Sequence, residues 1–432
     1  MKSIIKFLTI IFCLFIMSQN LNQLSYGQDK QDKQIKQDKQ ITKGIILEST
    51  FTNVAYGWAK AERYKVDNEN FPVEDYPLDG RGDQDGQRLQ LFGNKQPHSS
   101  QFLLYYALGW DKSDKSIPIL LVHGANDNAD RAWANPGEYG FGCGTPICAK
   151  TGLMQSLVSE GYKVFAINFP HKHGDNLLWA QQIGAAISQI KTITGVSQVN
   201  VIAWSKGAFA TRLYASGIKP KWGKPYDNDI NKLILVGSPN LGIDYAFRHG
   251  ATFNALVFPT CGGFKINGPA AHTSVFCQEK WQTFPELSIY TTKSGNFFPG
   301  QKQMLTKWAD KFSLPENETD YKTTYYGGKG TVSESLGIDV AIEQGSLVSQ
   351  VLSSEIPKSI NTYLLAGNKA DIPFFHNEHT GASDGLVFLD SATSKTAIGN
   401  LVDTKIIEAN HLLLPWHSKS VVQISEWLKK GK

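Results

Sequence analysis

Apolar runs alternate with stretches of helical spacing along most of the chain after about residue 44. The run at 118–124 is continuously apolar and ends in glycine, as expected for a buried parallel strand. Further strands are predicted at 163–170, 199–204, 232–237, 361–367 and 404–409. Helices are predicted at 152–162, 176–194, 208–216 and 418–430. This alternation predicts an α/β protein with a mainly parallel sheet and helices on both faces.

Two local features refine this pattern. The segments Arg88–Gly93 and Ser100–Trp110 are predicted to form an antiparallel pair of strands that opens the sheet. Asp175 stands where it can cap the helix at 176–194, which we expect to end before Gly195.

The periodicity weakens between residues 241 and 346. This stretch is rich in glycine, proline and aromatic residues. A hundred residues of irregular chain inside one domain are typical of an active-site cap or lid. A surface excursion held by a disulfide between Cys261 and Cys277 is the structural alternative, and the two are compatible.

The N-terminus has the pattern of an export signal. Lys2 and Lys6 precede an apolar run, Phe7–Met17, that is too short to span a bilayer. Cleavage is predicted after Gly27, which lowers the formal charge from +4 to +2 by removing these two lysines. Residues 28–43 then form a polar, low-complexity leader. We therefore expect a secreted or periplasmic protein with one domain over 44–432 and no transmembrane anchor.

Composition narrows the function further. The 432 residues carry 43 Lys and Arg against 39 Asp and Glu, a near balance that argues against a nucleic-acid-binding protein. Four cysteines would remain after cleavage, and their simplest pairing is Cys143–Cys148 and Cys261–Cys277. Spacing alone does not decide among the three possible pairings.

The strongest chemical signal is Ser205. It lies between the predicted strand at 199–204 and a helix, in the sequence Ala203-Trp204-Ser205-Lys206-Gly207. This is the G-x-S-x-G nucleophile motif with alanine at the first glycine position. The tight turn needs small residues two positions on either side of the serine, and Ala203 and Gly207 meet that need. A serine nucleophile also needs a base oriented by an acid.

Four segments together resemble the α/β-hydrolase lipases. VHGAN at 122–126 is similar to the oxyanion loop of bacterial lipases, and AWSKG at 203–207 to the serine box of Bacillus lipases. SDGLVFLDSA at 383–392 and ANHLLLPWHS at 409–418 resemble the acid and histidine segments of Pseudomonas- and Burkholderia-type lipases. The resemblance implies Ser205 as nucleophile, Asp384 as acid and His411 as base. It also implies an oxyanion hole made by the backbone N–H groups of Ala125 and Lys206.

Several assignments have rivals. Asp371 is the alternative acid, because it lies nearer the end of the strand at 361–367. His417 is an alternative base on the same loop as His411, and we favour a surface position at a helix start for it. His123 is expected to shape the oxyanion loop. The motif His171-x-His173-x-Asp175 could bind a metal, although an ordinary hydrogen-bonded loop is favoured.

These patterns predict a secreted serine hydrolase that cleaves carboxylic esters, as a lipase or esterase, through an acyl-enzyme. No cofactor or metal site is predicted, and the calcium site of the Pseudomonas-type lipases is not expected because Leu413 occupies the corresponding region. The substrate is expected to be a small ester, a lipid or a polyester, with contact to a lipid interface as an option. One alternative is an extracellular polyhydroxyalkanoate depolymerase with the same chemistry. A binding protein on a hydrolase scaffold without activity is a further one.

Overall fold

The computed structural model describes residues 42–431 apart from Asp79, Phe141, 250–269, 275–287, 292–294 and Phe374. The chain divides into two units, Met1–Lys43 and Gly44–Lys432, and every element given below belongs to the second. The predicted signal sequence and nearly all of the leader lie outside the described residues. So do Cys261 and Cys277, and their pairing stays a prediction.

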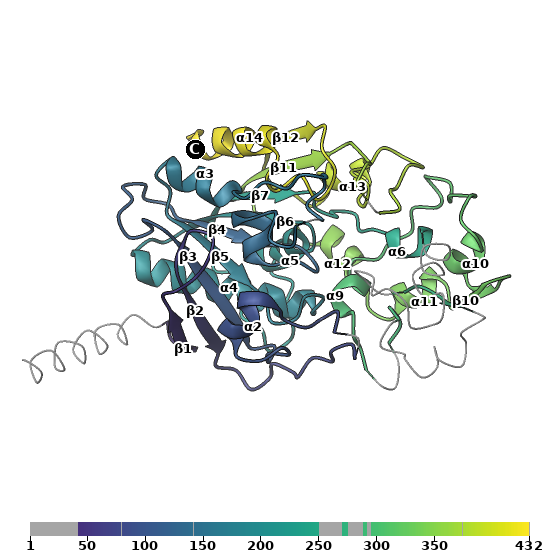
Figure 1. Ribbon diagram of the computed structural model, residues 1–432, viewed down its shortest axis with the longest axis horizontal. Coiled ribbons are helices and arrows are strands. Elements are labelled where there is room, and N and C mark those ends of the chain that lie inside the picture. The colour runs from purple at the N-terminus through teal and green to yellow at the C-terminus, as the bar shows by residue number, and fades with distance from the viewer. Residues whose placement is uncertain are drawn as a thin grey trace, which may run out of the picture. The chain divides into compact units, whose positions relative to one another are not determined.

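A nine-stranded sheet forms the centre of the second unit (Figure 1). The strands lie in the order β1-β2-β3-β5-β4-β6-β7-β11-β12. The pairs from β1 to β5 along this order are antiparallel, and those from β5 to β12 are parallel. The bounds are β1 Ile45–Phe51, β2 Trp58–Val66, β3 Gln101–Ala107, β4 Ile119–Val122, β5 Val164–Asn168, β6 Val199–Trp204, β7 Ile230–Val236, β11 Asn361–Gly367 and β12 Leu401–Ile407.

Helices cover both faces of this sheet because its central strands are apolar on both sides. In β6, Val201 and Ala203 join one hydrophobic cluster, whereas Ile202 and Trp204 join another, as the two-residue period of a strand requires. The first cluster includes α4 (Asn176–Thr194) and α5 (Lys206–Ala215). The second includes α3 (Leu153–Ser159) and α14 (Ser418–Lys429). The predicted α/β-hydrolase architecture, with a mainly parallel sheet between two helical layers, is therefore correct.

The N-terminal part of the sheet differs from the prediction. The segment at 88–93 is not a strand but part of helix α2 (Gly86–Phe92), which Gly93 ends with a left-handed φ of 74°. Its buried residues, Arg88, Leu91 and Phe92, have the i, i+3, i+4 spacing of one helix face. The antiparallel partners of β3 are instead β2 and β5, and neither β1 nor β2 was predicted.

The other predicted elements agree with the structure within a few residues. The side chain of Asp175 accepts hydrogen bonds from the backbone N–H groups of Leu177, at 2.7 Å, and Leu178, at 3.4 Å, so its capping role is confirmed. The predicted Cys143–Cys148 disulfide is also present. Within the described residues, no helix combines the length and the apolar character needed to cross a membrane.

The chain between β7 and β11 carries short elements with a core of their own. A three-stranded sheet has the order β8-β10-β9, and a separate apolar cluster includes Phe247, Ile289, Tyr325 and Ile338. The cap or lid role predicted for 241–346 stays a prediction. The short elements of this region are α6 (Tyr245–Arg248), β8 (Thr273–Ser274), α9 (Pro299–Lys302), α10 (Tyr321–Tyr326), β9 (Gly328–Lys329), β10 (Ser333–Ser335), α11 (Ile338–Glu343) and α12 (Val348–Ser353).

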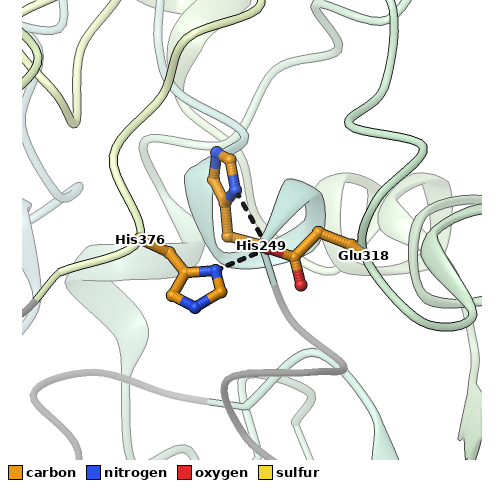
Figure 2. Close-up of side chains that lie close together, drawn as sticks. All are labelled: His249, Glu318 and His376. Carbon is orange, nitrogen blue, oxygen red and sulfur yellow. Dashed lines mark hydrogen bonds and ion pairs between the residues drawn. The ribbon is translucent and has the colours of Figure 1, made fainter.

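Polar side chains connect this region to the segment that follows β11. The Glu318 carboxylate lies between the imidazoles of His249 and His376 (Figure 2). One of its oxygens is 3.7 Å from His249 Nδ1 and 2.5 Å from His376 Nδ1. Since His376 precedes Asp384 on the same segment, the insertion contacts the stretch of chain that carries the predicted triad acid.

Candidate active site

Ser205 occupies a strained turn between β6 and α5. Its φ of 56° and ψ of −127° are unusual for a residue with a side chain, and strain of this kind concentrates at functional sites. A Cβ on Gly207 would lie 2.2 Å from the backbone oxygen of His123, and one on Gly124 would lie 2.9 Å from Ser205 Cβ. The turn therefore requires glycine at 207, as the nucleophile motif implies, and the adjoining oxyanion loop requires glycine at 124.

The structure brings Ser205, His411 and Asp384 together in a hydrogen-bonded chain. Ser205 Oγ is 2.8 Å from His411 Nε2, and His411 Nδ1 is 2.7 Å from Asp384 Oδ2. His411 and Asp384 are buried, with 3% and 0% of their surface exposed. This is the geometry in which a buried carboxylate orients an imidazole toward a serine hydroxyl.

The backbone holds the Asp384 carboxylate in place. Its Oδ1 atom accepts hydrogen bonds from the N–H groups of Leu386, at 3.1 Å, and Val387, at 2.8 Å. The backbone N–H of His411 donates to the carbonyl oxygen of Asp384 at 2.8 Å. Oδ2 is thereby turned toward the imidazole, and the two segments are joined through their main chains as well.

The rival residues lie in other surroundings. Asp371 has 46% of its side chain exposed, pairs with Lys369 at 3.1 Å and accepts from Asn410 Nδ2 at 3.1 Å. His417 immediately precedes the first residue of α14, which agrees with a helix-start position. His123 is buried beside the oxyanion loop, and burial lowers its pKa to about 4, although the neighbouring Asp127 favours the charged form.

The predicted oxyanion donors lie on either side of the serine. Ala125 follows Gly124, whose Cα faces Ser205, and Lys206 is the first residue of α5. Both backbone N–H groups therefore belong to segments in direct contact with the serine. The N-terminus of α5 adds a partial positive charge at the same place.

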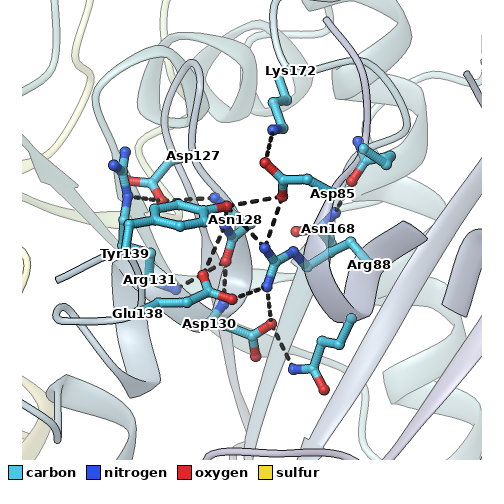
Figure 3. Close-up of polar contacts among 12 residues, drawn as sticks. Asp85, Arg88, Asp127, Asn128, Asp130, Arg131, Glu138, Tyr139, Asn168 and Lys172 are labelled. Carbon is cyan, nitrogen blue, oxygen red and sulfur yellow. Dashed lines mark hydrogen bonds and ion pairs between the residues drawn. The ribbon is translucent and has the colours of Figure 1, made fainter. Parts of the chain in front are cut away.

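A buried network of charges supports the oxyanion loop (Figure 3). The Arg88 guanidinium is fully buried and contacts Asp85, Asp130, Glu138 and Tyr139. Its Nη1 is 2.9 Å from Asp130 Oδ2 and its Nη2 is 2.9 Å from Asp85 Oδ1. The chain immediately after Ala125 is therefore anchored to α2 by ionic hydrogen bonds, which are stronger than neutral ones.

The same network extends to the loop after β5. Lys172 Nζ is 2.9 Å from Asp85 Oδ2, and the carbonyl oxygen of Lys172 accepts from the N–H of Asn126 at 3.1 Å. Although burial opposes ionisation, Lys172 and Arg88 hold the pKa of Asp85 at about 2. Asp85 thus remains charged at neutral pH, and the contacts of Lys172 tie the loop at 126 to the loop at 172.

The side chain of Lys206 was not anticipated from the sequence. It is fully buried, and its Nζ lies 2.9 Å from the centre of the Trp179 ring. Burial lowers the pKa of Lys206, whereas the nearby carboxylates of Glu74 and Asp175 oppose this. Burial also raises the pKa of Glu74 to about 8. The side chain of Lys206, the residue after the nucleophile, is therefore held in the protein interior.

The His171-x-His173-x-Asp175 motif forms a hydrogen-bonded loop. His171 Nε2 is 3.1 Å from the carbonyl oxygen of Asp75, and His171 Nδ1 accepts from the backbone N–H of His173 at 2.9 Å. Asp175 caps α4 and accepts from Gln303 at 2.7 Å. These contacts use both ring nitrogens of His171 and the Asp175 carboxylate, whereas His173 Nε2 is buried without a hydrogen-bond partner among the described residues.

A small pocket lies beside the triad. It is partly open, and the space between its walls, about 220 Å³, includes open solvent. Trp204 and Leu412, the neighbours of Ser205 and His411, form part of its wall together with Trp416 and Cys143. The Trp204 ring is 5.5 Å from the His411 ring, so an apolar wall adjoins the base.

Part of the chain is similar to known lipases. Residues 116–279, which include β4, the oxyanion loop and Ser205, match the family model described as Lipase (class 2). Over these residues the chain is similar to lipases of this class. It is 26% identical over 137 residues to triacylglycerol lipases of Pseudarthrobacter phenanthrenivorans and Burkholderia plantarii. The match covers 30% of this chain and 35% and 31% of those proteins, so the chain spans about a third of each relative's length.

Solved structures also align with this chain at low sequence identity. The mature lipase BlEst2 of Bacillus licheniformis aligns with 74% of this chain and 94% of its own, with 15% identity and a TM-score of 0.38. An esterase of Pyrococcus furiosus aligns with 76% of this chain and 85% of its own, with 12% identity and a TM-score of 0.38.

Proposed function

We propose that the chain hydrolyses carboxylic esters with Ser205 as nucleophile, His411 as base and Asp384 as acid. The observation that carries the proposal is the continuous hydrogen-bonded chain from Ser205 Oγ through the imidazole to a buried carboxylate. The strained backbone of Ser205 is a second, independent feature that nucleophile turns share.

The proposed reaction follows from the positions of the two imidazole nitrogens. Asp384 Oδ2 accepts a hydrogen bond from the Nδ1–H group of His411, so Nε2 is free to take the proton from Ser205 Oγ as the hydroxyl attacks the ester carbonyl. The imidazolium then donates this proton to the departing alcohol. Water, deprotonated by the same nitrogen, attacks the acyl-enzyme and releases the acid.

The oxyanion that forms in each step would be bound by the N–H groups of Ala125 and Lys206. Such donors are effective because they are fixed before the charge develops, and losing one costs about 3–4 kcal/mol in the barrier. Here the Arg88 network behind the first donor and the buried Lys206 side chain behind the second support this rigidity.

We infer an uncharged, apolar ester as the substrate. The aromatic wall formed by Trp204 and Trp416 favours apolar groups, and the relatives named above are triacylglycerol lipases. The near balance of acidic and basic residues also suits a neutral ester better than a polyanion. Lipid or acyl esters are therefore the proposed class.

We also propose that the protein is exported. The sequence of residues 1–27 supports this, and the Cys143–Cys148 disulfide is of the kind that persists in oxidising compartments. Detection of the mature protein outside the cytoplasm, beginning after Gly27, would test it. Full-length protein retained in the cytoplasm would contradict it.

Turnover of p-nitrophenyl esters of increasing acyl length tests the proposed activity. We expect saturable hydrolysis that Ser205→Ala abolishes and that Ser216→Ala, at the other end of α5, leaves unchanged. Equal hydrolysis by Ser205→Ala and the unaltered chain would refute the role of Ser205. A preference among acyl lengths would then identify the class of ester.

A further inference from the structure

Two imidazoles and a carboxylate meet where three distant segments come together (Figure 2). His249 follows α6, Glu318 precedes α10, and His376 lies between β11 and Asp384. One ligand atom from each residue lies within 4.8 Å of the other two, and the two rings are 6.3 Å apart. Within the described residues, this is the one cluster of three such side chains that meets this distance.

The Glu318 carboxylate is incompletely satisfied. Its side chain is 4% exposed, and Oε1 makes both of the contacts to the imidazoles described above. Oε2 is buried without a hydrogen-bond partner among the described residues. A buried carboxylate oxygen without a partner is unfavourable, and a bound cation would satisfy it.

A second carboxylate orients His249. Glu378 Oε2 is 3.1 Å from His249 Nε2 and accepts a hydrogen bond from it, while Arg248 Nε donates to the same oxygen at 2.6 Å. His249 Nδ1 faces Glu318 Oε1 at a distance of 3.7 Å. A carboxylate behind an imidazole is also the usual support of a metal-binding histidine.

The balance of buried charge points the same way. Asp244, Glu318 and Glu378 are buried carboxylates, and Arg248 is the buried cation that pairs with two of them. These four side chains comprise three acidic groups and one basic group, an excess of two acidic groups. A divalent cation would neutralise this excess.

We propose that His249, Glu318 and His376 bind one divalent transition-metal ion of the zinc class. The ligands would be the Nδ1 atoms of the two histidines and a carboxylate oxygen of Glu318. Two nitrogens and one oxygen suit Zn²⁺, whereas Ca²⁺ prefers six to eight oxygens. The partial exposure of the His376 side chain, 33%, leaves access for water as a fourth ligand.

The distances require a small adjustment. In a tetrahedral zinc site with bonds of about 2.1 Å, ligand atoms are separated by about 3.4 Å. The contact of Glu318 with His249, at 3.7 Å, is already close to this value. The contact with His376, at 2.5 Å, would open by about 1 Å on binding, which rotation of two side chains supplies.

The bound ion would join the insertion to the segment that leads to Asp384. It would thus act as a structural clamp, and it is independent of the proposed ester hydrolysis. Removing the ion is expected to lower the unfolding temperature whether or not the protein is an esterase.

Metal analysis of the full-length protein tests the proposal. After exposure to Zn²⁺ and gel filtration, we expect one zinc per chain, and with Co²⁺ the visible absorption bands of a tetrahedral site. His376→Ala and Glu318→Gln should each weaken binding at least tenfold, whereas the control His379→Ala, an exposed histidine of the same segment, should bind as the unaltered chain does. No bound metal in the unaltered chain, or equal binding by Glu318→Gln, would overturn the proposal.

X-ray absorption of the zinc-loaded, unaltered chain provides a test that does not depend on folding of the variants. Two nitrogen ligands from imidazole, with oxygen in the remaining positions, are expected. Sulfur ligands, or oxygen ligands alone, would place the metal elsewhere and contradict the proposal. A thermal shift that Zn²⁺ causes in the unaltered chain and in His379→Ala, but not in Glu318→Gln, would support it.

Discussion

Replacing Asp384 by asparagine separates the shape of the acid from its charge. Oδ1 of Asp384 accepts from two backbone N–H groups, at 3.1 and 2.8 Å. In Asp384→Asn the amide oxygen must take this place, because an NH₂ group there would face two donors. The NH₂ group is then left facing His411 Nδ1, at the position where Oδ2 is now 2.7 Å away.

This orientation predicts the wrong tautomer of the base. With an N–H donor opposite Nδ1, the imidazole must carry its proton on Nε2, and it can no longer accept the proton of Ser205. The same change in other serine-histidine-aspartate triads lowers kcat by about 10⁴-fold, which corresponds to about 5 kcal/mol in the barrier. We expect a loss of this size with little change in the folded structure.

The assay is kcat/KM on a p-nitrophenyl ester, with circular dichroism and thermal unfolding as checks of folding. Asp371→Asn is the matched control, because that carboxylate is half exposed and contacts Asn410 and Lys369. It should retain activity within about threefold. A larger loss in Asp371→Asn than in Asp384→Asn would refute the assignment of the acid.

Three further changes test the supporting structure. In Gly207→Ala the new Cβ would lie 2.2 Å from the backbone oxygen of His123. We therefore expect either that turnover falls below detection or that the free energy of unfolding, measured in urea, falls by at least about 2 kcal/mol. Full activity together with full stability would contradict the close contact. Arg88→Met leaves Asp130 buried without its cation and should cost about 3–5 kcal/mol in urea unfolding, and a loss below about 1 kcal/mol would contradict the network. Burial lowers the pKa of His171 to about 3, so its contribution to stability is present above about pH 6.5 and is lost as the pH falls toward 3. Between pH 6.5 and 5 this loss amounts to about 2 kcal/mol, and His171→Gln should remove it; the same slope in both proteins would refute the buried neutral state.

The architecture was predictable where burial imposes a single pattern. The strand at 199–204 is apolar at almost every position because helices cover both faces of the sheet there, and the boundary before Ser205 followed directly. The short segment at 88–92 carries no such constraint. Alternation of its apolar residues favoured a strand, whereas the long-range pairing of Arg88 with Asp130, 42 residues away, accompanies a helix.

The edge strands were missed for a related reason. In β1 only Ile45 is fully buried, and in β2 charged residues alternate with apolar ones. Their position depends on pairing with β3, which local sequence does not reveal.

The residues of the site also differ in whether the sequence predicted them. Ser205, Asp384 and His411 were predicted because each stands in a motif whose neighbours are constrained by the same chemistry. The buried side chain of Lys206 and the cluster of His249, Glu318 and His376 have no local motif. The three residues of the cluster lie far apart in the sequence, as do Lys206 and Trp179, and they come together only in the folded chain. No spacing in the sequence therefore indicated these contacts.

The most direct test of the proposed activity is the mass of the protein after reaction with a fluorophosphonate. We expect one adduct per chain, located on Ser205 by peptide mapping, which forms on the folded protein and does not form on protein unfolded by heat beforehand. Ser205→Ala should form no adduct, and Ser216→Ala should react at the unaltered rate. A folded, unaltered chain that forms no adduct, or that carries it on another residue, would contradict the claim that Ser205 is the nucleophile.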